Sequence, residues 1–230
     1  MNKISIIIPI FNEVNSISKL LLHLESEIFQ KEAIEIIVVD GGSTDSSQDS
    51  LRTNFNMRLI EVGKGRAKQM NAGAKAATGN ILYFIHCDSF PPKHFDQIIT
   101  DEVQKGNLAG CFRLKFDYNH PLLIVSQWFT RFNHISCRGG DQSLFITKNL
   151  FEEIKGFDEK YIIYEDNEII SRLYAKKQFV VLPDCIVTSA RRYRENGVWR
   201  LQFHFGIIHL KRRLGHSTES MLRYYKKHIL

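Results

Sequence analysis

Hydrophobic residues in the first part of the chain form short runs that end in polar or glycine-rich turns. These runs cover residues 4–10, 34–39, 58–62 and 81–85. Nearly continuous apolar runs of this length are typical of strands buried on both faces of a parallel sheet. Residues 17–28 instead repeat apolar positions at helical spacing, and the glycines that open 63–79 lead into an alanine-rich helix. The alternation predicts an α/β, Rossmann-like, doubly wound and mostly parallel sheet.

The pattern changes after Pro92. We expect helices at 93–105, 121–133 and 165–177, and strands at 108–116, 143–147, 179–182 and 186–192. The pattern in residues 197–230 predicts two basic amphipathic helices, with a break between them near Gly215. No repeat or low-complexity linker divides the chain. We therefore expect one domain over 1–196, with 197–230 as its small helical C-terminal extension.

Polar residues follow three of the predicted strands at the point where each strand ends. They are the segments Pro9 to Glu13, Asp40 to Asp45 and His86 to Ser89. The carboxyl ends of parallel strands share one edge of the sheet, where α/β proteins bind ligands. A carboxylate fixed there can hold a divalent cation whose coordination is completed by a phosphate. The alternative is a set of polar strand ends that face water.

Composition indicates an ordinary globular protein, with 43% hydrophobic and 24% charged residues. Four cysteines form no CxxC pair, so neither a zinc site nor a disulfide framework is indicated. The N-terminus lacks a signal-peptide pattern, and no apolar span is long enough for a transmembrane helix. We expect a cytoplasmic protein.

The net charge of +6 is concentrated at one end of the chain. Residues 191–230 hold ten Lys/Arg against two Asp/Glu. Such a segment could face anionic lipid, nucleic acid or a phosphorylated substrate. Aromatic and aliphatic residues between its basic residues allow it to lie on the inner face of the cell membrane as an interfacial helix. Packing against the domain or against a second subunit in a homodimer is the alternative.

Six segments in order resemble family 2 glycosyltransferases of the GT-A fold. They are IIIPIFNE, EIIVVDGGSTD, GRAKQMNAGAKAATGNILYFIHCDS, GGDQSLF, YEDNE and SARRYRENG. The resemblance covers nearly the whole chain and is strongest to the compact bacterial subgroup called rSAM/selenodomain-associated transferase 2. It implies a nucleotide-sugar donor, a divalent metal, Mn²⁺ or Mg²⁺, and no nucleic-acid partner.

The resemblance implies that the donor nucleotide lies along the first two strand ends. Asp40 corresponds to the carboxylate that accepts a hydrogen bond from the base, typically uracil, although it could instead form the turn before Gly41. Gly65 and Arg66 match a loop that closes on the diphosphate, where arginine offers a bidentate fork. The other donor-binding residues implied are Pro9, Phe11, Glu13 and His86. Core packing of Phe11 and a helix-terminal charge at Glu13 are alternatives.

The metal-binding signature of the family is reduced in this chain. Asp88 matches the last acid of the DxD signature, but the first acid is replaced in His86-Cys87-Asp88. His86 could bind the ribose or join the metal, where imidazole would favour Mn²⁺ over Mg²⁺; a structural role is the alternative. A single carboxylate should hold metal weakly, so we expect metal and donor to bind together.

The resemblance implies that Asp166 is the catalytic base, with Glu165 as the second candidate. A base at this helix start deprotonates the acceptor hydroxyl, which attacks the anomeric carbon and inverts it. Repulsion between adjacent carboxylates can raise one pKa toward a useful value. Capping of the helix is the alternative role for this pair.

Further residues are implied on the acceptor and diphosphate sides. Asp141 and Gln142 match a loop that lines the acceptor and the donor sugar, although a surface turn fits the same residues. Arg191, Arg192 and Arg194 match a basic element that folds over the diphosphate and offsets charge on the leaving group. A basic or lipid-facing surface is the alternative for these arginines.

The sequence as a whole predicts an inverting, metal-assisted glycosyltransferase that uses a nucleotide-sugar, first of all a UDP-sugar, and an unidentified acceptor. The main alternative is a catalytically weak or inactive nucleotide-binding module on a membrane, which the reduced acidic signature favours. A sugar-nucleotide-forming nucleotidyltransferase would need a glycine-rich basic loop after the first strand, where this chain has Pro9 to Glu13.

Overall fold

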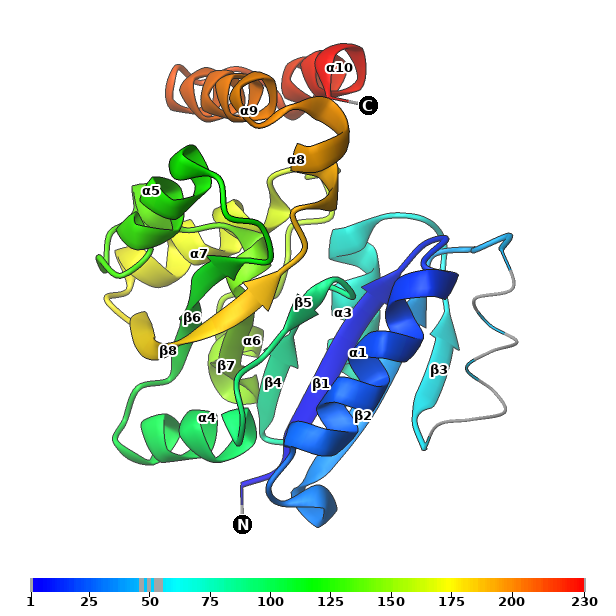
Figure 1. Cartoon of the computed structure of the whole chain (residues 1–230). Coiled ribbons are helices and arrows are strands. Elements are labelled where there is room, and N and C mark those ends of the chain that lie inside the picture. The colour runs from blue at the N-terminus through cyan, green and yellow to red at the C-terminus, as the bar shows by residue number, and fades with distance from the viewer. Residues whose placement is uncertain (1, 46–47, 49–50, 52–55, 230) are drawn as a thin grey trace.

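The computed structural model describes residues 2–45, 48, 51 and 56–229. Its strands form one sheet in the order β3-β2-β1-β4-β7-β6-β8-β5 (Figure 1). Their bounds are β1 Ile4–Ile10, β2 Ile34–Asp40, β3 Arg58–Glu61, β4 Ile81–Phe84, β5 Ser89–Phe90, β6 Ala109–Phe116, β7 Leu144–Thr147 and β8 Val180–Thr188. The described α-helices are α1 Val14–Glu27, α3 Arg66–Ala76, α4 Phe95–Gln104, α5 Pro121–Phe129, α6 Lys148–Glu153, α7 Glu165–Ala175, α8 Arg191–Asn196, α9 Val198–Arg213 and α10 Thr218–His228.

The first four strands form the parallel half of the sheet. β1 pairs in parallel with both β2 and β4, and β2 pairs in parallel with β3. In this register Ile10 lies opposite Asp40, and Ile7 lies opposite Phe84. The carboxyl ends of β1, β2 and β4 therefore meet at one edge, as the sequence predicts. The helix expected after Asp45 lies mostly outside the described residues.

The second half of the sheet is mixed. β7 is antiparallel to β4 and β6, β6 is parallel to β8, and β5 is antiparallel to β8. β5 follows β4 after only residues 85–88, yet it pairs at the far end of the strand order. The sheet must therefore curl back toward the end of β4. The expected α/β, Rossmann-like and mostly parallel fold is confirmed, with an antiparallel section that the sequence does not indicate.

Helices cover both faces of the sheet, and strand alternation sorts the core between them. Ile7 and Leu82 point to the face covered by α3, α6 and α7. Ile6 and Tyr83 point to the opposite face, covered by α1 and α4. Successive side chains of a strand point to opposite faces, so continuous apolar runs are required here.

Two predicted elements differ from the structure. The helix expected over 121–133 ends at Phe129, because buried Arg138 donates to the carbonyls of Thr130 and Phe132 and fixes the following loop. The two strands expected at 179–182 and 186–192 are one strand, β8. In the pairing of β8 with β6, Phe112 lies opposite Leu182 and the next residue, Arg113, lies opposite Cys185. Pro183 therefore lies in a bulge, where its missing N–H costs no hydrogen bond between the strands.

Glu35 joins three strands at the amino-terminal edge of the sheet. Its Oε1 accepts hydrogen bonds from Ser5 Oγ, from Thr78 N at 2.6 Å and Oγ1 at 2.9 Å, and from Gly79 N at 3.0 Å. Burial acts to raise the pKa of Glu35, but these donors outweigh it and the pKa lies below its ordinary value of 4.5.

We expect Glu35→Gln to lower the stability at neutral pH by roughly 1–3 kcal/mol, because the backbone N–H groups of Thr78 and buried Gly79 lose a charged acceptor. A lowered folded pKa means that this stabilisation is present above pH 4.5 and is lost as the pH falls through the folded value. Thermal melts of both proteins from pH 7 to pH 3 should therefore converge in acid. A constant difference across that range would contradict the assignment.

The C-terminal helices pack over the carboxyl edge of the sheet (Figure 1). Leu201 and Ile208 of α9 are buried against Met221 of α10 and contact Ile163 and Tyr164. The break between α9 and α10 falls at Leu214 to Ser217, as expected. Within the described residues, no helix has the length and apolar character needed to cross a bilayer.

Candidate active site

The segment after β4 forms a tight turn that separates its three side chains. The amide of Ser89 donates to the carbonyl of His86 at 3.1 Å, and the carbonyl of Asp88 accepts from Ser189 N at 3.0 Å. Cys87 points into the core and is 5% exposed. His86 and Asp88 remain partly exposed. The turn therefore presents the imidazole and the carboxylate and buries the thiol between them.

His86 lies between two carboxylates from distant parts of the chain. Its Nδ1 is 3.4 Å from Oδ1 of Asp141, and its Nε2 is 3.4 Å from Oδ2 of Asp166. Burial and the charge of Arg66 act to lower the pKa of His86, but the two carboxylates outweigh them and raise it to about 10. The two carboxylates therefore favour the protonated ring, in which each nitrogen carries an N–H group toward a carboxylate.

This arrangement favours Asp88 over His86 as the metal ligand, and the metal role of His86 stays a prediction. A ligating imidazole must be neutral and must offer a nitrogen lone pair. Both ring nitrogens of His86 instead face carboxylates, and its charge would repel a cation. The imidazole of His86 lies between Asp141 and Asp166 and supplies the positive charge that faces these two carboxylates.

A second ion pair closes the site on the α3 side. Arg66, the first residue of α3, donates from Nη1 to Oε1 of Glu165 at 3.0 Å. Glu165 is 1% exposed, and its Oε2 is buried without a hydrogen bond. Burial and neighbouring Asp166 raise the pKa of Glu165. Because it faces Arg66 rather than the solvent, Glu165 positions that guanidinium, and it is poorly placed to act as a base.

The loop before β7 holds Asp141 and Asp166 in place. Asn167 of α7 donates from Nδ2 to the carbonyl of Arg138 at 2.9 Å, which ties this loop to the helix that carries Asp166. A Cβ added to Gly140 would lie 1.9 Å from Oδ2 of Asp166 and 2.8 Å from Cε1 of His86. Glycine is therefore needed at this position for the two side chains to meet. A small cavity here is lined by Phe84, His86, Gly140, Ser143, Leu144, Asp166 and Ile170.

Asp88 is a carboxylate of the site whose surroundings disfavour its charged form. Burial, and then the negative charges of Asp141 and Glu13, raise its pKa, while His86 opposes them. In the described ranges 2–45, 48, 51 and 56–229, no three His, Cys, Asp or Glu side chains are arranged to hold a metal ion. The residues therefore fit a metal only as a site with one carboxylate, in which phosphate oxygens would complete the shell.

Asp141 and Gln142 are adjacent in the sequence, but their side chains have different surroundings. Burial acts to raise the pKa of Asp141, but the hydrogen bond and charge of His86, then Arg66 and Arg192, hold it below its usual value. Gln142 is 2% exposed, accepts from Gly139 N at 3.1 Å and donates to the carbonyl of Phe112 at 3.2 Å. The amide of Gln142 is thus engaged inside the fold, and its role toward the sugar stays a prediction.

The residues at the first two strand ends lie at the same edge of the sheet. They differ in how far their side chains are exposed to contact a ligand. Asp40 is fully buried, and its carboxylate already accepts from Gly42 N, Ser43 N and Oγ, and Gln48 Nε2. This matches the turn-forming alternative, and a base could reach Asp40 only after one of these donors moved. Pro9 is buried within β1. Phe11 is 36% exposed, and Lys64 Nζ lies 3.8 Å from its ring centre.

The three arginines after β8 lie on the short helix α8 and not on a strand or loop. Arg191 lies 4.0 Å from Glu13 at the end of β1, so it reaches the shared edge of the sheet. Arg192 donates to the hydroxyl of Tyr225, and its charge also acts on Asp141. Arg194 pairs with Asp117 at 2.9 Å, just after the carboxyl end of β6, which runs parallel to β4 and ends at the same edge. The diphosphate role of Arg194 stays a prediction, and in this structure its guanidinium is paired with Asp117.

Several supporting residues escape sequence reasoning. Buried Gln69 of α3 donates to the carbonyls of Ile10 and Val39 and so joins the ends of β1 and β2. Arg138 and Asn167 act through backbone carbonyls, which leave no mark in a sequence pattern. The signal for Gly140 was present in the Gly139-Gly140 pair, but the side chains that require it come from two other elements.

Comparison with known proteins assigns the chain to a family. The model of "Glycosyl transferase family 2" matches residues 5–157. "Probable glycosyltransferase YdaM" of Bacillus subtilis is 25% identical over 75% of this chain and 46% of its own length. The poly(ribitol-phosphate) beta-N-acetylglucosaminyltransferase TarS of Staphylococcus aureus is 30% identical over 63% of this chain and 23% of its own length.

Solved structures agree on the fold. TarS 1-349 in complex with UDP-GlcNAc superposes with a TM-score of 0.67 at 20% identity, over 81% of this chain and 58% of that one. The mannosyltransferase PcManGT of Pyrobaculum calidifontis, in complex with GDP-Man and Mn²⁺, superposes with a TM-score of 0.71 at 18% identity, over 94% of this chain and 65% of that one. The chain spans less than half the length of the two curated relatives named above. From the family model and these folds, the chain belongs to glycosyl transferase family 2.

Proposed function

We propose that this protein is an inverting glycosyltransferase that transfers a sugar from a nucleotide-sugar, first of all a UDP-sugar, to an unidentified hydroxyl acceptor. The observation that carries the proposal is the contact of His86, which lies two residues before Asp88 in the turn after β4, with Asp166 at the start of α7. This contact supports a diphosphate at the strand ends and a base at the helix start on two sides of one site.

In the proposed reaction, Asp166 accepts the proton of the acceptor hydroxyl. The acceptor oxygen forms a bond to the anomeric carbon, the bond from that carbon to the diphosphate oxygen breaks, and the configuration inverts. Asp166 is only 15% exposed, and His86 orients its carboxylate from one side. A positioned base of this kind contributes roughly 10² to 10⁴ in rate.

The diphosphate would lie where positive groups gather at the sheet edge. Arg66 begins α3, so its guanidinium and the positive end of the helix dipole face the same region. Arg191 approaches the region from α8. Asp88 would hold the metal, Mn²⁺ or Mg²⁺, which when bound neutralises charge on the leaving diphosphate. Neighbouring structures that contain UDP-GlcNAc, or GDP-Man with Mn²⁺, support a donor and cofactor of this chemistry.

Incubation with a panel of UDP- and GDP-sugars tests this function directly. We expect slow release of nucleoside diphosphate from one donor without acceptor, dependent on Mn²⁺ or Mg²⁺ and abolished by a chelator. Release separates an enzyme from an inactive nucleotide-binding module. No release from any donor, with nucleotide binding intact, would favour the module.

Metal and nucleotide should stabilise the protein together. With UDP and Mn²⁺ at about 100 times the dissociation constant, we expect roughly 2.7 kcal/mol of stabilisation, or about 5–10 °C in melting temperature. UDP or Mn²⁺ alone should shift it far less, since we propose Asp88 as the only carboxylate that holds the metal. Asp88→Asn should remove the joint shift, while the exposed control Asp184→Asn should keep it. No shift at millimolar UDP or GDP with metal would contradict the proposal.

A further inference from the structure

The helix α9 exposes an apolar stripe to solvent. Trp199, Phe203, Leu210 and Leu214 are 70%, 65%, 55% and 69% exposed, although each is a large hydrophobic side chain. At roughly 100° of rotation per residue, these positions fall within an arc of about 60° on one side of the helix and its last turn. The stripe therefore runs along the whole of α9.

The stripe is not the face with which α9 packs on the protein. The buried residues of this helix are Val198, Leu201 and Ile208, which lie on the opposite side of the helix. The helix is thus apolar on two faces, one of which is satisfied by the fold. The second face needs another apolar environment.

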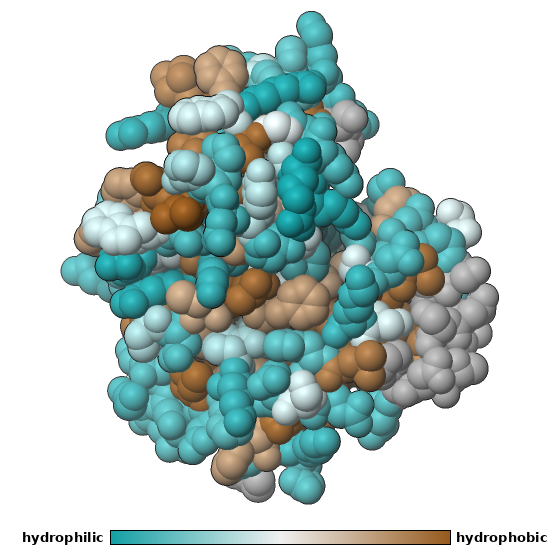
Figure 2. Space-filling model, in the orientation of Figure 1, coloured by the Kyte–Doolittle hydropathy of each residue, from teal (hydrophilic) through white to brown (hydrophobic). Residues whose placement is uncertain are grey.

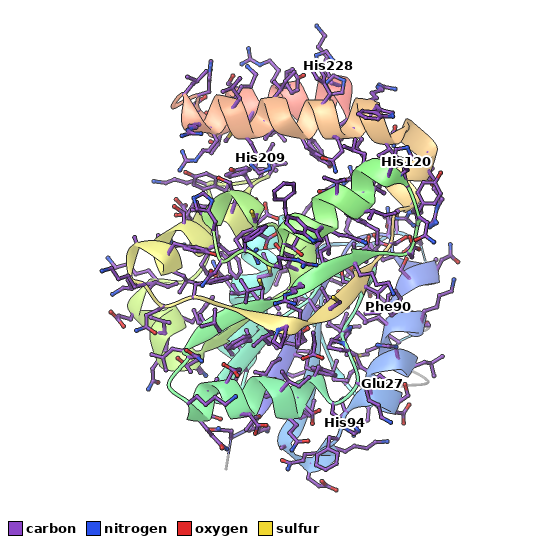
Figure 3. The ribbon with its side chains drawn as sticks, turned by 60° about the vertical axis from the view of Figure 1, so that its left-hand side comes forward. Glu27, Phe90, His94, His120, His209 and His228 are labelled. Carbon is purple, nitrogen blue, oxygen red and sulfur yellow. The ribbon has the colours of Figure 1, made fainter. Side chains whose placement is uncertain are left out.

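α5 continues the exposed apolar surface. Leu123 of α5 and Val198 of α9 are buried in one cluster, and the rings of His120 and Trp199 meet edge to face at 6.2 Å. Figure 3 shows His120 at the end of α5 that lies beneath α9. The half-exposed apolar residues of α5 and the turn after it are Ile124, Val125, Trp128, Phe129 and Phe132. Figure 2 shows brown side chains over both helices on the same side of the molecule.

Positive charge borders this surface. The guanidinium of Arg131 lies 4.7 Å from the ring centre of Trp128. On α9, Arg213 lies beside one edge of the stripe, and Arg200 and Lys211 lie beside the other. The adjacent α10 adds Arg223, Lys226 and Lys227. Residues 197–230 contain one acidic residue, Glu219.

We propose that the exposed faces of α5 and α9 form a docking surface for an anionic phospholipid bilayer, with both helices lying in the interface. Aromatic residues, aliphatic residues and flanking Lys/Arg are the composition of interfacial helices, and the basic rim complements anionic headgroups. A partner copy of this chain would meet the same positive rim and would be repelled by it.

The surface is connected to the candidate active site. Tyr164, two residues before Asp166, exchanges a hydrogen bond with Nδ1 of His209 on α9 at 2.9 Å. Figure 3 shows His209 below α9, on the side facing the domain. Docking would thus hold the site beside the headgroups. This last consequence rests on the proposed function, whereas the docking itself does not.

Tryptophan fluorescence provides a direct test, because the chain's two tryptophans, Trp128 and Trp199, both lie on the docking surface. The full chain should co-sediment with vesicles of phosphatidylcholine containing about 30% phosphatidylserine, and its emission should shift to the blue. Vesicles of phosphatidylcholine alone should bind at least roughly tenfold more weakly. Raising NaCl from about 0.1 M to about 0.5 M should weaken the anionic binding.

A matched pair of double variants tests whether this surface is the one that binds the bilayer. Trp199→Gln with Phe203→Gln should lower the vesicle partition coefficient roughly tenfold or more, since two exposed anchors are lost without a change in the core. Leu22→Gln with Phe29→Gln removes similarly exposed apolar side chains on and just after α1 and should leave binding unchanged. Absent vesicle binding, or equal binding by both variants, would overturn the proposal. So would a dimer in analytical ultracentrifugation that Trp199→Gln with Phe203→Gln dissociates. Nucleoside diphosphate release is independent of these outcomes, so failure here leaves the proposed function standing.

Discussion

Asp166→Asn should lower the rate of sugar transfer by roughly 10² to 10⁴ while leaving nucleotide and metal binding unchanged. Asparagine has the size of aspartate, and its amide oxygen can still accept from His86, so the site should keep its shape. It cannot accept the proton of the acceptor hydroxyl. The loss should therefore appear in turnover and not in the joint thermal shift with UDP and Mn²⁺.

Glu165→Gln is the informative comparison for this result. Glu165 is buried against Arg66, so its substitution should weaken donor binding through a displaced guanidinium. A turnover equal to wild type in Asp166→Asn would reject the base assignment. A larger loss of turnover in Glu165→Gln, with donor binding preserved, would move the base to Glu165.

Gly140→Ala should lower turnover by roughly 10² or more, although the residue carries no side chain of its own. The new Cβ would overlap Oδ2 of Asp166, at 1.9 Å, and would crowd His86. The carboxylate is the end of a side chain and can swing away, so the fold should persist while the base leaves its position. A misplacement of about 1 Å is enough for a 10²-fold loss.

Gly139→Ala is the matched control for this prediction. A Cβ at Gly139 meets nothing within 4 Å, and the backbone there is extended, with φ of −162°. The control should therefore retain near wild-type activity and stability. Equal activity in the two variants, measured as nucleoside diphosphate release together with thermal melts, would show that the contact between the loop and Asp166 has no role.

The parallel half of the fold was predictable because its signals are local. Residues 4–10, 34–40 and 81–84 are apolar runs, and each became a buried strand with its polar end at the shared edge. The mixed half depends on contacts made later in the chain. α8 is an example: Asp117, at the end of β6, accepts from Ala190 N at 2.7 Å and pairs with Arg194, which supports a helix where alternation indicates a strand.

The candidate site was predictable as a set of residue types but not as a set of partners. The position of Asp88 at a strand end follows from the run before it. His86 was less accessible to sequence reasoning, because its partner Asp141 lies 55 positions away, and the Arg66–Glu165 pair is separated by 99. Gln142 and Asp40 match motif positions, but their polar side chains already have hydrogen-bond partners within the protein. Contact partners, more than residue identity, decide which groups remain available for a ligand.

Crystals soaked with UDP and Mn²⁺, and measured for the anomalous scattering of manganese, test the central claim most directly. The account predicts one manganese peak at coordination distance from the carboxylate of Asp88, bridging the diphosphate, with Asp166 facing the open side where a sugar would project. Manganese bound by His86, or UDP bound away from the edge where β1, β2 and β4 end, would contradict it.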